Sequence, residues 1–188
     1  MNFDVLIIGA KACGFTGALL LVAACAHPIA TRHQLALDEL LQFTSPTMCE
    51  LSAPHRHLLD GMIAGDANAG FSPGLILAPK GMRRLFGPIE VRRHDSYWTV
   101  EASVEGTLFG IPLVAIIHSL PEGGDAGDVT YVFGAPIATV ESALRARGFP
   151  ARAGQEVELG SPDLQVPVMA LLVDPKSRGR TLLSCYYR

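Results

Sequence analysis

Two histidines offer the first candidates for chemistry in this chain of 188 residues. His55 and His57 flank Arg56 at the start of an expected helix. Residues two apart on a helix point in different directions, so joint binding of a metal ion is geometrically poor. The sequence therefore predicts two solvent-exposed histidines in a first helical turn.

His118 is the candidate for a general base. It lies in an apolar stretch, where a buried imidazole with Glu101 or Glu105 as its partner could accept a proton. The alternative is a structural histidine in the core or at a strand end. The chain has no G-x-S-x-G, H-E-x-x-H, P-loop or S-x-x-K motif, which are patterns of common hydrolases and NTPases. We predict no catalytic residue set, and a non-enzymatic protein is favoured over an enzyme.

The sequence does not place its possible metal ligands at the spacings of the common metal-binding motifs. Residues 123–128, GGDAGD, lack the alternating oxygen ligands of an EF-hand loop and are not repeated. There is no Cys-x-x-Cys and no zinc-type Cys/His spacing. We predict a plain loop at residues 123–128, and neither a metal ion nor a cofactor.

Positive charge gathers in residues 80–94 of a chain whose net charge is −3. If the loop and the strand that follows it share a face, they form a basic patch with two apolar side chains inside it. Such a patch suits an acidic protein partner or phospholipid headgroups. The alternative is a solvated edge strand protected by its charges. The candidate partner-binding residues are Lys80, Arg83, Arg84, Leu85, Phe86, Arg92 and Arg93.

The N-terminal residues 4–25, DVLIIGAKACGFTGALLLVAAC, place Gly9 and Gly14 between an apolar run and a predicted helix. This stretch resembles the N-terminus of FAD-dependent oxidoreductases, and the resemblance implies a dinucleotide site. Lys11, however, replaces the middle glycine of G-x-G-x-x-G, and the next segment has helical instead of strand periodicity. A flavoprotein of this kind also needs a much longer chain, so a truncated relative is the weaker interpretation.

The same stretch fits an export signal. Lys11 precedes an apolar run over residues 12–24, which is too short to span a bilayer alone. Residues Val22 to Cys25, V-A-A-C, resemble the lipobox of bacterial lipoprotein precursors. The resemblance implies that residues 1–24 are a signal peptide and that the Cys25 thiol carries a lipid anchor; Ala26 then favours the outer membrane over the inner. The alternatives are an uncleaved anchor and a buried helix with a free Cys25.

The lipobox resemblance also bears on the four cysteines, Cys13, Cys25, Cys49 and Cys185. Removal of Cys13 and lipidation of Cys25 leave one pair, the even number expected in an oxidising compartment. A disulfide between Cys49 and Cys185 would close a long loop and stabilise the domain by a few kcal/mol. Two unpaired buried thiols are the alternative.

Composition indicates one folded domain. The chain is 49% hydrophobic and 18% charged, and it is long enough to bury a core without metal or disulfide support. Its slightly negative charge gives no general attraction to nucleic acid. We expect one mature domain over residues 25–188.

Hydrophobic spacing predicts the elements of that domain. Residues 33–43 have helical periodicity, with Leu37, Leu40 and Leu41 on one face, and a second helix runs from the N-cap Ser52 to a stop at Gly65. A loop follows over residues 66–81. A third helix begins near residue 136 and stops at residue 148. Apolar alternation and runs predict strands over residues 89–94, 97–105, 111–120, 129–133, 155–159, 166–173 and 181–187.

These elements predict an α+β fold: an antiparallel sheet of about five to seven strands, with two N-terminal helices and one later helix packed on one face. With the lipid anchor, they predict an envelope lipoprotein that faces the periplasm. Its domain would bind another envelope or periplasmic component, as an assembly factor or as an inhibitor or immunity-type protein. The open alternative is an enzyme, either the truncated flavoprotein relative or a hydrolase that uses His118.

Overall fold

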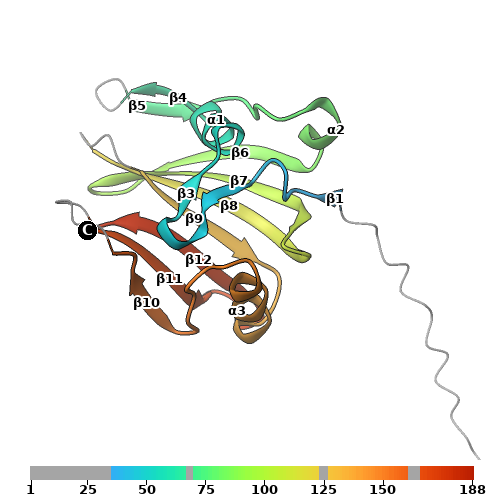
Figure 1. The fold of residues 1–188 in the computed structure, drawn as a ribbon. Helices are drawn as coiled ribbons and strands as arrows, with labels where there is room; N and C mark the ends of the chain where they lie inside the picture. Colours follow the sequence, from blue (N-terminus) through green and yellow to red (C-terminus); the bar gives the residue numbers. More distant parts are fainter. Residues whose placement is uncertain (1–34, 67–69, 123–126, 161–165) are drawn as a thin grey trace, which may run out of the picture. The chain divides into compact units, whose positions relative to one another are not determined.

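A computed structural model describes residues 35–66, 70–122, 127–160 and 166–188, all within one compact unit, His33–Arg188 (Figure 1). Strands dominate this unit. The expected α+β class is wrong, because only one of the two predicted N-terminal helices forms and the domain is mostly β. The helices of the described ranges are α1 (Ala53–Gly61), α2 (Lys80–Arg83), α3 (Ile137–Ala146) and the short 3-10 helix η1 (Pro46–Met48).

One large sheet forms the body of the unit. Its continuous order is β1 (Leu35–Ala36), β7 (Tyr97–Leu108), β8 (Ile111–Pro121), β9 (Asp128–Phe133), β12 (Thr181–Tyr187), β11 (Pro167–Val173) and β10 (Gln155–Glu158), and β6 (Phe86–Arg93) also pairs with β7. All neighbours are antiparallel except β1 and β7. The seven antiparallel strands, β6 to β12, match the predicted five to seven, and the two-residue parallel strand β1 makes an eighth; the helices are the part that differs.

Buried and exposed side chains alternate along β7 and show which face of the sheet is the inner one. Val100, Ala102 and Val104 are buried, whereas the side chains between them are partly or fully exposed. The register places Val100 opposite His118 of β8, and His118 opposite Val129 of β9, so these three side chains share the inner face. The strands thus carry His118 toward the covering segments and Glu101 away from them.

Residues 33–43 do not form the predicted helix. After β1 the chain makes a single turn, in which Leu41 N–H donates to the Leu37 carbonyl at 2.8 Å, and it then enters β2 (Phe43–Ser45). One such turn buries Leu37, Leu40 and Leu41 together, with the same spacing that a longer helix would give. The periodicity was real, but it extends over one turn only.

The second predicted helix is α1. Ser52 caps it by accepting a hydrogen bond from the His55 backbone N–H at 3.4 Å, and Pro54 stands in its first turn. The helix ends at Gly61, four residues before the predicted stop. The predicted loop over residues 66–81 is also partly wrong, because β4 (Ile63–Asp66) pairs with β5 (Gly70–Pro73) and α2 follows.

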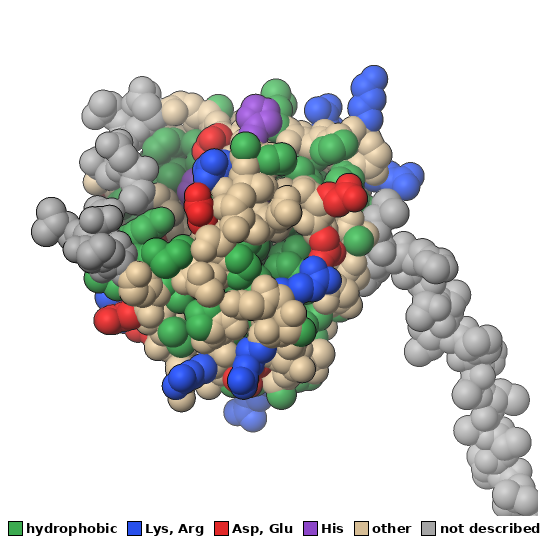
Figure 2. Space-filling model, in the orientation of Figure 1, with side chains coloured by type: hydrophobic (Ala, Val, Ile, Leu, Met, Phe, Trp, Pro, Cys, Tyr) green, Lys and Arg blue, Asp and Glu red, His purple; other side chains and the backbone are tan. Residues whose placement is uncertain are grey.

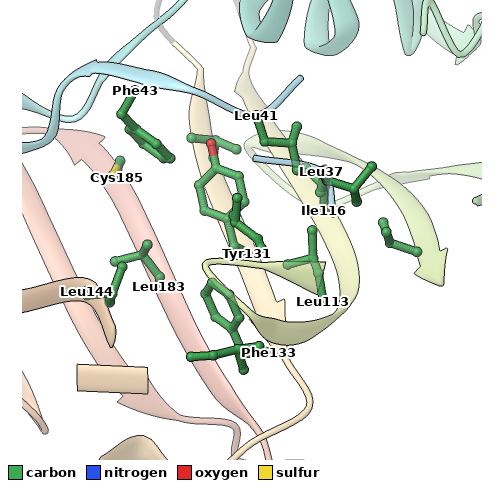
Figure 3. Close-up of a cluster of buried hydrophobic side chains, with 14 of the residues drawn as sticks. Leu37, Leu41, Phe43, Leu113, Ile116, Tyr131, Phe133, Leu144, Leu183 and Cys185 are labelled. Carbon is green, nitrogen blue, oxygen red and sulfur yellow. The ribbon is translucent and has the colours of Figure 1, made fainter. Parts of the chain in front are cut away.

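The core lies between the inner face of the main sheet and the segments that cover it (Figure 3). Leu41 and Phe43 reach down from the covering chain toward Tyr131 of β9, and Leu144 of α3 lies beside Leu183 of β12. The Phe43 and Tyr131 ring centroids are 5.6 Å apart. Each large apolar side chain buried in this way contributes about 1.5–3 kcal/mol, so packing on this face holds α1 and α3 in place.

Candidate functional site

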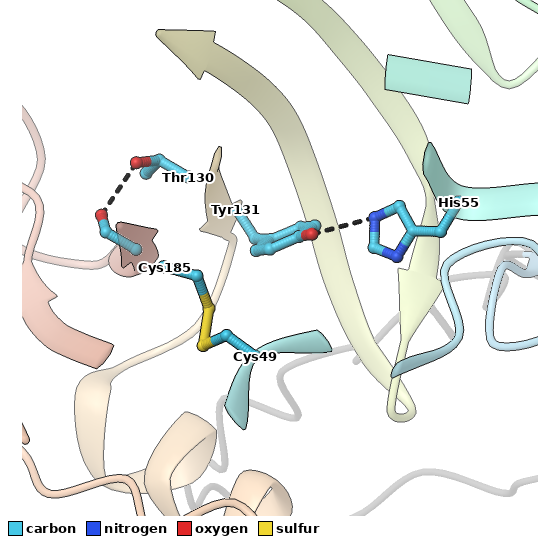
Figure 4. Close-up of a disulfide and its surroundings, with 6 residues drawn as sticks. Cys49, His55, Thr130, Tyr131 and Cys185 are labelled. Atoms are coloured by element: carbon cyan, nitrogen blue, oxygen red, sulfur yellow. Dashed lines mark hydrogen bonds between the residues drawn. A yellow bond between two sulfur atoms is a disulfide. The ribbon is translucent and has the colours of Figure 1, made fainter. Parts of the chain in front are cut away.

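The predicted disulfide between Cys49 and Cys185 is present in the structure (Figure 4). Cys49 lies between η1 and β3 (Glu50–Leu51), and Cys185 lies in β12; their Cα atoms are 6.0 Å apart. The bond joins residues separated by 136 positions. In the loop-entropy model, a cross-link of that span stabilises a fold by about 5 kcal/mol. It fastens the β2–β3 segment to the inner face of the sheet.

His55 is buried, which contradicts the prediction of an exposed histidine; His57 is exposed as expected. His55 Nδ1 lies 3.3 Å from the Gln42 carbonyl oxygen, and Nε2 lies 2.9 Å from the Tyr131 hydroxyl (Figure 4). A carbonyl can only accept, so Nδ1 carries the proton and donates, and the Tyr131 O–H donates to Nε2. Both ring nitrogens of His55 therefore have a hydrogen-bond partner. His55 and His57 do not converge on a metal site.

Burial determines the charge states of this pair. It lowers the pKa of His55 to about 4, which keeps the imidazole neutral near pH 7. It raises the pKa of Tyr131 well above its usual value. Both groups therefore stay uncharged in the core, where they specify packing and are not free to exchange protons with a ligand.

His118 faces a different carboxylate from the two that the sequence suggested. Glu101 is opposite Ile117, the neighbour of His118, and it therefore points to the other sheet face, as does Glu105 by alternation. Asp60 of α1 is the acidic group that acts on His118. Burial lowers the pKa of His118, and the Asp60 charge opposes that shift.

A hollow of about 400 Å³ lies beside His118, with Arg56 and Asp60 also in its wall. The Nδ1 atom of His118 is buried and has no hydrogen-bond partner among the described residues. On the other side of the ring, a Cβ placed on Gly127 would lie 2.3 Å from Nε2, so only glycine fits there. Arg56 is partly committed, since its Nη1 donates to the Leu51 carbonyl at 2.7 Å.

The predicted basic patch divides into two parts. Lys80 and Arg83 lie on α2, with Arg84 at its end, whereas Arg92 and Arg93 lie at the far end of β6. At about 3.3 Å per residue, roughly 20 Å of strand separates Arg92 from the start of β6. The structure therefore does not bring these charges into one surface.

The two apolar members of the patch are not available to a partner. Leu85 and Phe86 are each 9% exposed and belong to the core. Arg92 forms ion pairs with Glu90 and Glu101, and Arg93 pairs with Glu122 at 2.9 Å. These neutralised charges fit the edge-strand alternative for the β6 half of the patch.

The α2 half of the patch borders an apolar groove of about 930 Å³. Ala53, Pro54 and His57 of α1 form one wall; Leu77 to Pro79 and α2 form the other; Glu39 and Leu40 complete it. We call this hollow the α1–α2 groove. Figure 2 shows Lys and Arg side chains gathered over α2 at the upper right of the molecule. The groove thus combines apolar walls with a cationic border.

Sequence reasoning did not find this groove. Its walls come from three separate stretches, and the packing of residues 77–79 beside α1 has no local signal beyond apolar residues in a proline- and glycine-rich loop. Asp60 was missed for the same reason. Its nearness to His118 depends on how α1 crosses the sheet, which hydrophobic spacing does not specify.

Several predictions fall outside the described residues. The predicted signal peptide, residues 1–24, and the predicted lipidation site Cys25 lie there, as do residues 123–126 of the glycine-rich loop. Within the described ranges, no helix has the length and hydrophobicity needed to cross a bilayer. The same part of the chain has no group of three or more His, Cys, Asp or Glu side chains placed to share a metal ion.

Comparison with known proteins gives no further guidance: no family model, curated protein sequence or solved structure shows significant similarity to this chain.

Proposed function

We propose that the chain is an envelope lipoprotein, anchored through Cys25, whose domain binds another envelope component without catalysing a reaction. The lipobox-like residues Val22 to Cys25 support the anchor, and Ala26 favours the outer membrane. The Cys49–Cys185 disulfide supports an address outside the cytoplasm, because structural disulfides persist in oxidising compartments. In this role the domain serves in envelope assembly, or as an inhibitor or immunity-type protein.

The α1–α2 groove is the observation that supports binding. Its volume of about 930 Å³ is within the range of ligand sites, and its walls include the half-buried Leu77, Ala78 and Met82. An apolar hollow of this size on a folded domain is typical of an interaction site. Because Leu85 and Phe86 are buried and the charges divide into two parts, the groove replaces the single basic patch of residues 80–93 as the proposed binding surface.

The hollow at His118 supports a second candidate, a hydrolase. Its specific observation is the buried Nδ1 of a neutral imidazole, which has no hydrogen-bond partner in the described part of the chain and lies close to Asp60. The described residues that line this hollow include no serine, threonine or cysteine, so water would be the nucleophile and His118 its base. Hydrolysis of a panel of chromogenic esters that is lost in His118→Gln and retained in His57→Gln would favour this candidate; no hydrolysis by the wild type would remove it.

In-cell photo-cross-linking tests the binding function. A photoreactive amino acid replaces His57, an exposed residue of the groove wall, in the full chain expressed in a bacterial envelope. The matched control carries the same amino acid at Leu172, which is 39% exposed on β11. We expect a discrete adduct from position 57, absent from position 172 and reduced when Ala53→Trp fills the groove. Equal adducts at both positions, or none at position 57, would contradict binding in the groove.

A further inference from the structure

The charges beside the α1–α2 groove differ from those elsewhere on the same stretch of chain. Lys80, Arg83 and Arg84 are exposed, and none of them forms an ion pair with a described residue. Arg92 and Arg93, by contrast, have carboxylate partners. No carboxylate of the described residues lies within ion-pair distance of these three cations, so their positive charge is available at one border of an apolar hollow, where it attracts an anionic group.

Arg83 connects the two properties of the groove. This exposed residue lines the groove, together with Met82 from the same helix and Leu77 from the preceding loop. A guanidinium presents several N–H donors in a planar fork, which suits a carboxylate or a phosphate. A ligand that fits both features has an apolar body and an anionic end.

Glu39 restricts the ligand further. Glu39, an exposed residue, also lines the groove, where its negative charge disfavours a second anionic group. An acidic protein segment or a nucleic acid carries negative charge along its length and meets this repulsion. A ligand with one anionic head and an uncharged tail avoids it.

We infer that the α1–α2 groove binds a single-chain anionic amphiphile, with the acyl chain along the half-buried Leu77, Ala78 and Met82 and the carboxylate or phosphate head at Arg83. This inference rests on the proposed binding function and names its ligand class. The volume of the groove is sufficient for a ligand of this kind, and burying each methylene of the chain contributes about 0.8 kcal/mol.

A photoreactive fatty acid tests the inference with the full chain held in phospholipid vesicles. The probe is a diazirine analogue of palmitate, and the cross-linked peptides are identified by mass spectrometry. We expect labelling to concentrate in residues 77–83 and around Ala53, and to fall when unlabelled palmitate competes. A lysophospholipid competitor distinguishes a phosphate-headed ligand from a fatty acid.

Two variants and one control should differ in how strongly the probe labels the groove. Arg83→Glu should lower groove labelling about fivefold, as loss and reversal of one exposed charge partner would do. Ala53→Trp, at an exposed position, should lower it at least as much by filling the groove. Arg178→Glu changes the same charge at an exposed site outside the groove and should leave labelling unchanged.

Labelling that spreads along the chain, or that is equal in all variants, would mean contact with the bilayer only and would overturn the inference. If the in-cell adduct from position 57 is a protein and the groove takes no probe, the inference is wrong and the binding function stands. If position 57 gives no adduct and the groove takes no probe, both are wrong.

Discussion

At the scale of single residues, His55 and Tyr131 show how the core of this domain uses polar groups. Both side chains are fully buried, and each has a hydrogen-bond partner: Tyr131 donates to His55, and His55 donates to the Gln42 carbonyl. A buried polar group left without a partner costs about 1–3 kcal/mol. The two hydrogen bonds therefore fix the position of α1 over β9 more specifically than apolar contacts alone would.

Substitutions in this pair should destabilise the fold. His55→Ala leaves a cavity and two unpaired partners, so we expect the free energy of unfolding in urea to fall by about 3 kcal/mol. Tyr131→Phe removes only the hydroxyl and should cost about 1–2 kcal/mol. His57→Ala, on the exposed face of the same helix, is the control and should change stability by less than about 0.5 kcal/mol. A cost at His57 as large as at His55 would show that the core pair has no special role.

Stability should depend on pH through the same histidine. The folded pKa of His55 is about 4 and the unfolded value is near 6.5, so the unfolded chain binds a proton first as pH falls. The stabilisation is complete above pH 6.5 and is lost between pH 6.5 and pH 4, for a total of roughly 3 kcal/mol. The lowered pKa of His118 acts in the same direction. Urea titrations at pH 7.5, 5.5 and 4.5 measure this loss, and it should be smaller in His55→Gln; equal slopes in the two proteins would contradict the assignment.

At the scale of elements, the segment from β2 to β3 depends on the disulfide. These two strands are short and pair only with each other, and Cys49 ties the connection between them to β12. Phe43 of β2 closes the aromatic cluster over Tyr131 and Phe149, with ring centroids 5.6 and 5.0 Å away. Loss of the Cys49–Cys185 disulfide should therefore loosen the segment from β2 to β3 over the core before it disturbs the main sheet.

Removal of the disulfide measures this contribution. We expect Cys49→Ala combined with Cys185→Ala to lower the free energy of unfolding by about 5 kcal/mol. Reduced wild-type protein should behave as the double variant does, and oxidised wild-type protein should not. If oxidised and reduced wild type unfold at the same urea concentration, the two cysteines are not joined.

The elements that the sequence predicted best are those whose residues alternate over several positions. Strand β7 follows this pattern from Trp98 to Val104, whereas its neighbour β8 was predicted from a nearly continuous apolar run over residues 111–120. The prediction of a helix over residues 33–43 was wrong because a single turn buries Leu37, Leu40 and Leu41 at helical spacing. The candidate site was less predictable still, since the α1–α2 groove and the approach of Asp60 to His118 depend on contacts between distant segments.

At the scale of the whole molecule, the proposed location at the envelope and the proposed binding surface belong to one protein. The disulfide and the lipobox-like residues favour a protein held at the envelope, with a mostly β domain that presents the α1–α2 groove. A lipid anchor limits diffusion to a surface, where a weak ligand site is occupied more often than it would be in solution. The location at the envelope is the central claim, because the proposed envelope partner depends on it.

Metabolic labelling with an alkyne analogue of palmitate tests that claim most directly. Cells expressing the wild-type chain, Cys25→Ala or Cys49→Ala are labelled, and the purified proteins are compared for the incorporated lipid. The account predicts label on the wild type and on Cys49→Ala, and none on Cys25→Ala. An unlabelled wild type, or equal label on Cys25→Ala, would contradict it.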